Sequence, residues 1–205
     1  MNLLEIKDVC RANLNKYTRK AFESIPKIDS PNILDIGCGT GVPTLEIAKL
    51  TTGKILAIDS DKESVNRLKE KVKKFKYEDR ILVVHDSVLL IKFVEKHFDI
   101  IVAEGLFNII GFEKGLAYFT KFLKKDGYFL IHDEFLNREK KLKIIEKYQY
   151  KLLDEITLNE DIWWNEYYSC LEKKLFDTEK VKSDIEMYKK NPKRFRSIYY
   201  ILKKI

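Results

Sequence analysis

Three alternating glycines between an apolar segment and a proline constrain the fold of this chain more than any other feature. Residues 33–41 read ILDIGCGTG, and Val42-Pro43 follows. Glycine reaches positive φ at little steric cost, so the backbone can turn sharply and approach a ligand closely. Proline suits the first turn of a helix. A strand, a glycine turn and a helix in this order are typical of an open α/β sheet, where ligands bind at the carboxyl ends of the strands.

Short apolar runs repeat this pattern along the chain. They are residues 32–36, 54–58, 81–85, 99–103 and 128–132. Most are apolar on both faces, as expected for the buried strands of a parallel sheet. Helical patterns separate or follow them at residues 42–50, 61–75, 112–124 and 137–147. This alternation predicts an α/β protein with a doubly wound, Rossmann-like, mainly parallel sheet and helices on both faces.

The two ends of the chain add further elements to this core. Residues 3–25 read as one or two helices that would pack near the start of the sheet, over its ligand site. We expect about seven strands in all and a single domain with four parts, which are an N-terminal helical cap (1–30), a cofactor-binding core (31–155), a helical insertion or lid (156–192) and a last strand (193–205). Within that plan, residues 148–153 and 197–203 would form a final strand pair, and residues 159–190 would be helical.

Charge and cysteine content narrow the class of protein. The net charge of +7 permits nucleic-acid binding without requiring it, and the basic residues are mixed with acidic ones, which favours a solvated surface. The cysteines Cys10, Cys38 and Cys170 have no paired spacing, so they predict neither a disulfide nor a zinc site. That usage fits a reducing cytoplasm. No apolar run approaches the ~20 residues that a membrane span needs. We therefore expect a cytoplasmic monomer or homodimer without a membrane partner.

The glycine spacing distinguishes between ligands. A dinucleotide fingerprint, G-x-G-x-x-G, would need glycine where Val42 stands, and the Gly-Lys-Ser/Thr of a phosphate-binding loop is absent. Asp35, inside the first strand, would repel a phosphate. It suits a ligand with cationic groups, such as the ammonium and sulfonium of S-adenosyl-L-methionine.

Acidic residues close three further strands. Asp59 lies 22 residues after Gly37 and could accept both hydroxyls of a ribose. Asp86 could accept from an adenine amino group, and Glu104 would face the methionine end of the ligand. A single acid at such a position could equally well be the N-cap of a helix as a ligand contact. Three acids at the ends of successive strands, together with a glycine loop, favour an adenosyl ligand.

These residues resemble the class I S-adenosylmethionine-dependent methyltransferases. The resemblance rests on residues 33–48 (ILDIGCGTGVPTLEIA), on Asp59 and Asp86, and on residues 98–105 (FDIIVAEG). It covers about residues 15–135 and is closest to small methyltransferase-domain proteins of the ubiquinone/menaquinone type. A similar E-G-x-x-x-x-x-G-F stretch runs from Glu104 to Phe112.

The resemblance implies a set of cofactor contacts. Asp35, Gly37 and Gly39 would hold the methionine portion, with Cys38 contributing backbone. The remaining implied contacts are Asp59 on the ribose, Ser60, Asp86 and Ser87 around the adenine, Glu104 near the transferred methyl group, and Tyr17 and Arg19 capping the cofactor, with Arg19 paired to its carboxylate.

Methyl transfer from a sulfonium is a direct displacement, which needs alignment and exclusion of water. A general base is needed only where the acceptor must lose a proton, and Glu104 and His132 are the candidates. His132 and Asp133 alone do not indicate a metal, and we expect none. The aromatic residues Trp163, Trp164, Tyr167 and Tyr168 could enclose an apolar or cationic acceptor, or could pack the insertion against the core.

Three interpretations of function follow. The leading one is methylation of a small molecule. RNA or protein methylation is the second, although residues 104–107 (Glu-Gly-Leu-Phe) lack the Asn/Asp-Pro-Pro-Tyr/Phe signature of amino methylation. A protein that binds S-adenosylmethionine without catalysis is the third.

Overall fold

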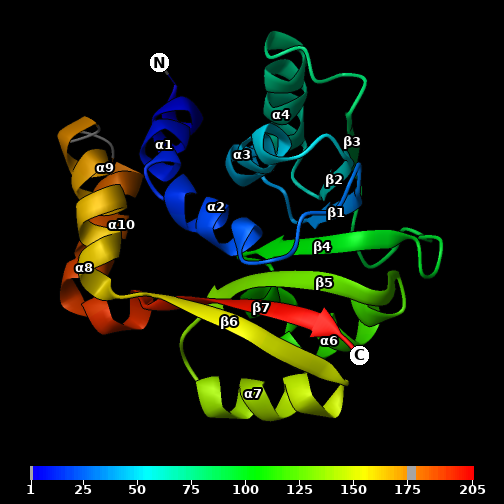
Figure 1. Cartoon of the computed structure of the whole chain (residues 1–205). Coiled ribbons are helices and arrows are strands. Elements are labelled where there is room, and N and C mark those ends of the chain that lie inside the picture. The colour runs from blue at the N-terminus through cyan, green and yellow to red at the C-terminus, as the bar shows by residue number, and fades with distance from the viewer. Residues whose placement is uncertain (1, 175–178) are drawn as a thin grey trace.

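A computed structural model describes residues 2–174 and 179–205, and within these ranges a seven-stranded sheet forms the centre of the protein (Figure 1). The strand order is β3-β2-β1-β4-β5-β7-β6. Among these strands, β7 alone runs in the opposite direction to the other six, and it pairs antiparallel with β5 and β6; the sheet is therefore mainly parallel, as the sequence predicts. The strands are β1 (Asn32–Ile36), β2 (Lys54–Asp59), β3 (Ile81–His85), β4 (Phe98–Glu104), β5 (Leu123–Glu134), β6 (Tyr150–Leu158) and β7 (Ser197–Lys204).

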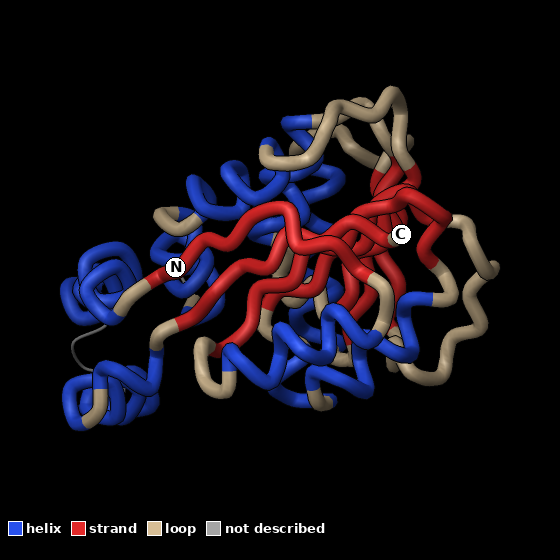
Figure 2. Tube along the Cα trace, turned by 60° about the horizontal axis from the view of Figure 1, so that its bottom comes forward, coloured by secondary structure: helices blue, strands red, loops and turns tan. Residues whose placement is uncertain are grey.

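Helices cover both faces of this sheet (Figures 1 and 2). On one face lie α2 (Asn15–Glu23), α3 (Val42–Leu50) and α4 (Lys62–Lys74); on the other lie α5 (Phe107–Ile110), α6 (Phe112–Thr120) and α7 (Arg138–Lys147). The remaining helical segments gather beyond the strand ends and are α1 (Leu3–Ala12), α8 (Glu160–Trp163), the π-helical turn η1 (Trp164–Tyr168), α9 (Ser169–Lys174), α10 (Glu179–Lys190) and the 3-10 turn η2 (Pro192–Phe195).

Two hydrophobic cores explain why the strands are apolar on both sides. In β1, Ile33 belongs to the core under α2, α3 and α4, while Leu34 and Ile36 belong to the core over α5 and α6. All three are at most 1 % exposed. Burial of both faces requires continuous apolar strands, and this pattern is what made the parallel sheet predictable from the sequence.

The boundaries of most elements follow the sequence pattern, with two clear differences. The strand expected over 148–153 is β6, which runs from Tyr150 to Leu158 and so reaches into the predicted insertion. The helix expected at 112–124 ends at Thr120, and β5 begins at Leu123. The Asp126-Gly127 pair therefore lies inside the first part of β5, where Asp126 has a φ of 60°. The predicted strand pair near the C-terminus is present as β6 and β7.

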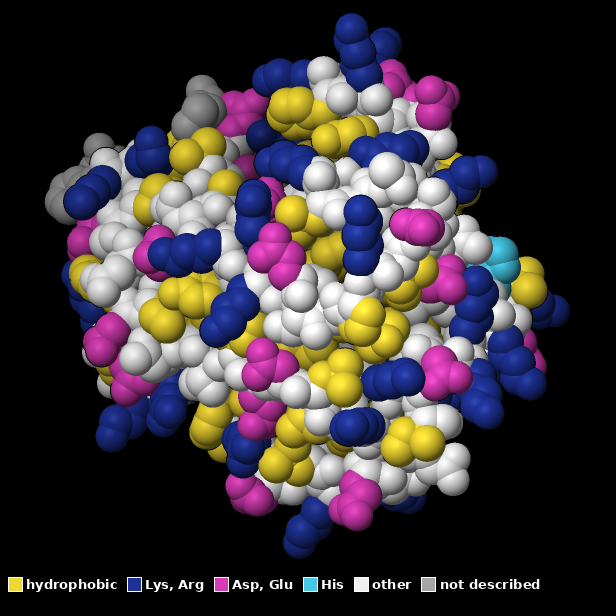
Figure 3. Space-filling model, in the orientation of Figure 1, with side chains coloured by type: hydrophobic (Ala, Val, Ile, Leu, Met, Phe, Trp, Pro, Cys, Tyr) yellow, Lys and Arg dark blue, Asp and Glu magenta, His cyan; other side chains and the backbone are white. Residues whose placement is uncertain are grey.

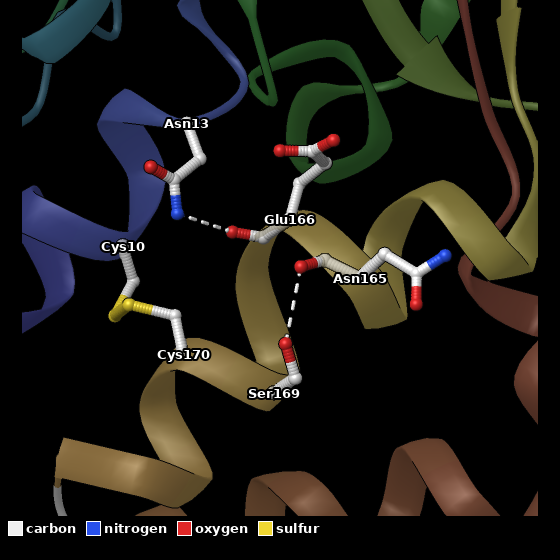
Figure 4. Close-up of a disulfide and its surroundings, with 6 residues drawn as sticks. All are labelled: Cys10, Asn13, Asn165, Glu166, Ser169 and Cys170. Atoms are coloured by element: carbon white, nitrogen blue, oxygen red, sulfur yellow. Dashed lines mark hydrogen bonds between the residues drawn. A yellow bond between two sulfur atoms is a disulfide. The ribbon is translucent and has the colours of Figure 1, made fainter.

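A third hydrophobic cluster joins the N-terminal helix to the C-terminal insertion. It includes Ile6 of α1, Leu171 of α9, Val181 of α10 and Phe195 of η2. Within it, Cys10 and Cys170 form a disulfide bond (Figure 4). The two halves of the chain are thereby linked at the carboxyl ends of the strands.

This disulfide corrects the prediction that the cysteines do not pair. The two residues are 160 positions apart, and nothing in their local spacing indicates that α1 and α9 pack together. The argument for a reducing compartment loses its basis with this pairing. Across the described residues, none of the helices combines the length and apolar character needed to cross a membrane.

Candidate active site

Two adjoining cavities lined by described residues lie where β1, β4 and β5 end. The larger, of about 500 Å³, includes Asp35, Glu104 and His132 in its wall. The smaller, of about 240 Å³, includes Asp59 and Ser87. Both are lined by Gly37 and Gly105, so they adjoin at these two residues, and we refer to the two together as the cleft. Its position at the carboxyl edge is the expected place for a ligand in an α/β sheet.

The glycine loop forms the floor of this cleft. Gly37, Gly39 and Gly41 have φ values of 72°, 52° and 77°, so each adopts a left-handed conformation that favours glycine. The amides of Gly37 and Cys38 both donate to the carbonyl of Ile58, at 2.9 and 3.0 Å. These bonds hold the turn against β2 and leave it close to the ligand space.

Asp35 is buried beneath this loop. Its side chain accepts a 2.6 Å hydrogen bond from Thr44, and the residue is 3 % exposed. Burial raises the pKa of Asp35 to about 7, and the nearby carboxylates of Glu104 and Asp59 push it in the same direction. A cation bound here would stabilise the ionised form, so the site is suited to an ammonium or a sulfonium.

Glu104 lies at the centre of a polar network between the sheet and the N-terminal helices. Its two oxygens accept from Arg11 Nη2 at 2.6 Å and from Thr18 Oγ1 at 3.0 Å. The Thr18 hydroxyl also lies 3.1 Å from that of Tyr199. Arg11 Nη1 is buried and has no hydrogen-bond partner within the described part of the chain. Since Arg11 lines the larger cavity, its guanidinium is a candidate partner there for an anionic group of a ligand.

Asp59 occupies the smaller cavity with its carboxylate held in place by backbone. One oxygen accepts from the amide of Gly39 and the other from the amide of Asp61, both at 2.8 Å. Each carboxylate oxygen can accept a second hydrogen bond, so the fixed carboxylate retains acceptors for hydroxyl groups. Ser60 and Ser87 line the same cavity.

Three of the expected cofactor contacts lie outside the walls that the described residues give these cavities. Asp86 follows β3 and binds the amide of Ser87 at 2.7 Å. Tyr17 packs against the core beneath α2 and α3. Arg19 pairs with Glu46, with a 3.1 Å bond from its Nε, and not with the cleft. Their roles with a ligand stay predictions, and Arg11 is better placed than Arg19.

The four aromatic residues of the insertion divide into two pairs. Trp163 and Tyr167 line the larger cavity. Tyr168 and Trp164 instead contact Tyr188 of α10, with ring centroids 4.4 and 5.6 Å apart. The sequence left open whether these residues enclose an acceptor or pack the insertion, and the two pairs differ in this respect. The first pair faces the ligand space, and the second pair packs the insertion.

His132 lies in the buried part of β5, which ends at Asp133, and lines the larger cavity with Trp163. Its Nε2 lies 2.8 Å from the Ser197 hydroxyl, and its ring stacks on that of Tyr199 with centroids 4.1 Å apart. Burial, and secondarily the charge of Arg11, hold the pKa of His132 well below its usual value. The imidazole is therefore neutral in the folded protein. The adjacent Asp133 forms an ion pair with Lys141, with 2.6 Å between Oδ2 and Nζ.

Sequence reasoning missed several residues of the larger cavity. These are chiefly Asp8 and Arg11 of α1, Asn108 of α5, and Arg194, Arg196 and Ser197 near the start of β7. The sequence did place the N-terminal helices over the site. The side of α1 that faces the cleft could be found only from its packing on α4 and α9, where Asp8 meets Lys71 at 2.7 Å and Cys10 meets Cys170.

Two further features bear on alternative functions. Among the described residues, no group of three or more His, Cys, Asp or Glu side chains is arranged to hold a metal ion. On the face shown in Figure 3, Lys and Arg side chains are dispersed among Asp, Glu and apolar side chains. This dispersal gives that face no continuous basic surface of the kind that tracks a nucleic-acid backbone.

Comparison with known proteins identifies the family. A family model described as a methyltransferase domain matches residues 29–175. The chain therefore belongs to the methyltransferase-domain family, in agreement with the resemblance and with the predicted cofactor, S-adenosyl-L-methionine.

Curated relatives fall into two groups by their names. The ribosomal protein L11 methyltransferase of Staphylococcus haemolyticus is 35% identical over 146 residues, which are 71% of this chain and 44% of that protein. The ubiquinone/menaquinone biosynthesis C-methyltransferase UbiE of Geotalea uraniireducens is 34% identical over 115 residues, or 55% of this chain and 49% of that protein. The chain thus spans about half the length of these relatives.

Solved structures support the fold. The [4+2]-cyclase SpnF superposes with a TM-score of 0.80 at 14% identity, covering 93% of this chain and 81% of that chain. A geranyl diphosphate methyltransferase, solved in complex with SAM, gives 0.76 at 10% identity, covering 93% and 85%. Because one of these neighbours is named a cyclase and the other a methyltransferase, the fold alone does not decide the reaction.

Proposed function

We propose that this protein is an S-adenosylmethionine-dependent methyltransferase that acts on a small-molecule acceptor by direct displacement. The observation that carries the proposal is the distribution of charge along the cleft. Asp35 and Glu104 lie in the larger cavity beside the free Arg11 Nη1, and Asp59 lies in the smaller cavity across Gly37. This arrangement offers partners for the ammonium, the carboxylate and the ribose hydroxyls of one ligand.

S-adenosylmethionine, when bound, supplies a methyl group on a positively charged sulfur. The residues of the chain would bind the cofactor, orient it towards the acceptor and shield both from water. Asp35 and Glu104 would hold the cationic amino acid portion, Arg11 its carboxylate and Asp59 the ribose. Glu104 is held in place by one bond to each oxygen, from Arg11 and from Thr18, which suits a fixed negative charge near the reacting carbon and not a mobile base.

The acceptor half of the cleft supports a small molecule. Helix α1 and residues 160–174 of the lid meet beside the larger cavity. The Cys10–Cys170 disulfide and a 2.8 Å bond from Asn13 to the carbonyl of Glu166 join them (Figure 4). A fastened lid with Trp163 and Tyr167 in the wall of the larger cavity suits a small acceptor, which these rings would shield from water.

A protein acceptor is the second candidate, since several relatives are named ribosomal protein L11 methyltransferases. The small-molecule and protein acceptors can be distinguished by incubating the protein with methyl-labelled S-adenosylmethionine and a whole-cell extract. The labelled products are then fractionated by size. We expect label in the low-molecular-weight fraction. Label in protein alone would replace the small-molecule proposal, and cofactor binding without labelling of any fraction would favour a non-catalytic role.

Cofactor binding is tested by calorimetry with Asp59→Ala, and Asp86→Ala is the matched control from the end of the next strand. Loss of a hydrogen bond to a charged group costs about 1.5–3 kcal/mol, so we expect Asp59→Ala to weaken S-adenosylmethionine binding by roughly tenfold to 150-fold for each ribose hydrogen bond that is lost. Asp86 lies outside the cleft walls and should have a smaller effect. Equal affinity of Asp59→Ala and the unmodified protein would remove the ribose assignment.

A further inference from the structure

A hydrogen-bonded chain of three side chains crosses from the lid to the end of the sheet. Trp163 Nε1 lies 2.9 Å from the Ser197 hydroxyl oxygen, and the same oxygen lies 2.8 Å from His132 Nε2. Ser197 is 6 % exposed and begins β7, and His132 faces Tyr199 two residues further along that strand. Trp163, His132 and Ser197 all line the larger cavity.

The directions of these two hydrogen bonds follow from the protons available. An indole N–H can only donate, so Ser197 accepts from Trp163. The serine hydroxyl has one proton of its own, and leaving it unpaired in a buried site would be costly. His132 Nε2 is the remaining partner among the described contacts of this hydroxyl. Ser197 therefore donates to His132 Nε2, which must carry a lone pair.

The ring plane of His132 is fixed by its neighbours. The imidazole is parallel to Tyr199 and to Trp163, with an interplanar angle of 6° in each case. Burial and the nearby Arg11 also disfavour a second proton on the ring, since they lower the pKa of His132. With Nε2 as an acceptor and the ring neutral, the single ring proton lies on Nδ1.

We infer that Ser197 is a positioning residue that holds His132 as the neutral Nδ1–H tautomer, so that His132 offers the methyl acceptor a hydrogen-bond donor and not a base. This inference rests on the proposed function. The acceptor then brings its own free lone pair to the displacement, as an amine, a thiolate or an enolate does. A carbonyl or carboxylate oxygen near the methylated atom is the group that the Nδ1–H would bind.

The test is nuclear magnetic resonance of the protein labelled with ¹⁵N-histidine, which reports directly on which ring nitrogen carries the proton. The chain has three histidines, so the signals of His132 are assigned by their loss in His132→Asn. We expect a protonated Nδ1 and an unprotonated Nε2. Ser197→Ala should shift the ring toward the Nε2–H form, and Ser197→Thr, which keeps the hydroxyl, should restore the Nδ1–H form.

A second variant leaves the serine in place. Trp163→Phe removes the indole donor, so the Ser197 proton is no longer directed to His132 and the two tautomers should mix. A proton on Nε2 of His132 in the unmodified protein overturns the inference. S-adenosylmethionine affinity is measured on the same samples. Lack of binding by the unmodified protein would count against the proposed function, whereas the tautomer is read without any ligand.

Discussion

The two halves of the cleft are built in different ways. The cofactor half consists of the glycine loop and the adjacent ends of β1 and β2, and backbone bonds hold it. Asp59, for example, is fixed by the amides of Gly39 and Asp61. The acceptor half consists of side chains from the lid and the start of β7, and a disulfide joins the lid to α1, which would also supply Arg11 to the cofactor.

This difference determines what disturbs each half. A backbone turn in a left-handed conformation disfavours any residue with a Cβ, and its bonds to Ile58 and Asp59 join positions only about 20 residues apart. The acceptor half depends on contacts between residues as far apart as Lys7 and Asp184, which are 177 positions apart, so it can loosen while the sheet stays folded. The predictions below disturb first one half, then the other, and then the residue at their junction.

The largest effect is expected from Gly41→Ala in the cofactor half. Gly41 has a φ of 77°, and a Cβ there would lie 2.1 Å from Cδ1 of Leu68. A left-handed alanine costs about 1–2 kcal/mol and overpacking about 1–3 kcal/mol, so we expect the free energy of unfolding to fall by about 2–5 kcal/mol. Thermal unfolding followed by circular dichroism measures the change.

Gly39→Ala is the matched control for that substitution. Its φ of 52° is also left-handed, but an added Cβ there has nothing within 4 Å. We expect only the conformational cost of about 1–2 kcal/mol. If the two variants unfold at the same temperature, contact with Leu68 contributes nothing to the requirement for glycine at position 41.

The acceptor half is tested by opening the Cys10–Cys170 disulfide. Cross-links that close long loops contribute typically about 2–4 kcal/mol, so a reducing agent should lower the melting temperature by roughly 4–16 °C. Hydrogen exchange should increase in α1 and α9 before it increases in the glycine loop. The double variant Cys10→Ser/Cys170→Ser should have the melting temperature of the reduced protein, and adding a reducing agent should not change it.

Unchanged exchange in α1 and α9 on reduction would contradict this division of the cleft. The two segments would then be held by the hydrophobic cluster around Leu171 and by ion pairs such as Lys7–Asp184, at 3.2 Å, without help from the cross-link.

The same contrast explains how much could be predicted from the sequence. The strands, the glycine loop and the positions of Asp35, Asp59 and Glu104 follow from local patterns, because each acid closes or lies within a strand that is apolar on both faces. Arg11, Ser197 and the disulfide could not be predicted, because they depend on which faces of α1 and the lid meet. The sequence showed that the aromatic residues lie close together, but it could not show that Trp163 lines the cavity whereas Trp164 packs on Tyr188.

Asp35 lies at the junction of the two halves, and its ionisation provides the smallest and sharpest test. Because its pKa in the folded protein is raised to about 7 from 3.8, the protonated form favours folding, and that contribution is lost as the pH rises from about 4 through 7. A bound cation favours the ionised form instead. Affinity for S-adenosylmethionine should therefore rise by roughly tenfold between about pH 6 and pH 8, as the carboxyl loses its proton.

The ligand's own amino group titrates near the top of this range, so the informative quantity is the ratio of the affinities of the unmodified protein and Asp35→Asn. The ligand's titration cancels in that ratio, whereas the ionisation of Asp35 does not. Asparagine keeps an acceptor for the Thr44 hydroxyl, which binds Asp35 at 2.6 Å, so the loop should retain its structure. A ratio that stays constant with pH would mean that Asp35 does not meet the cation, and that Glu104 alone supplies the negative charge in the larger cavity.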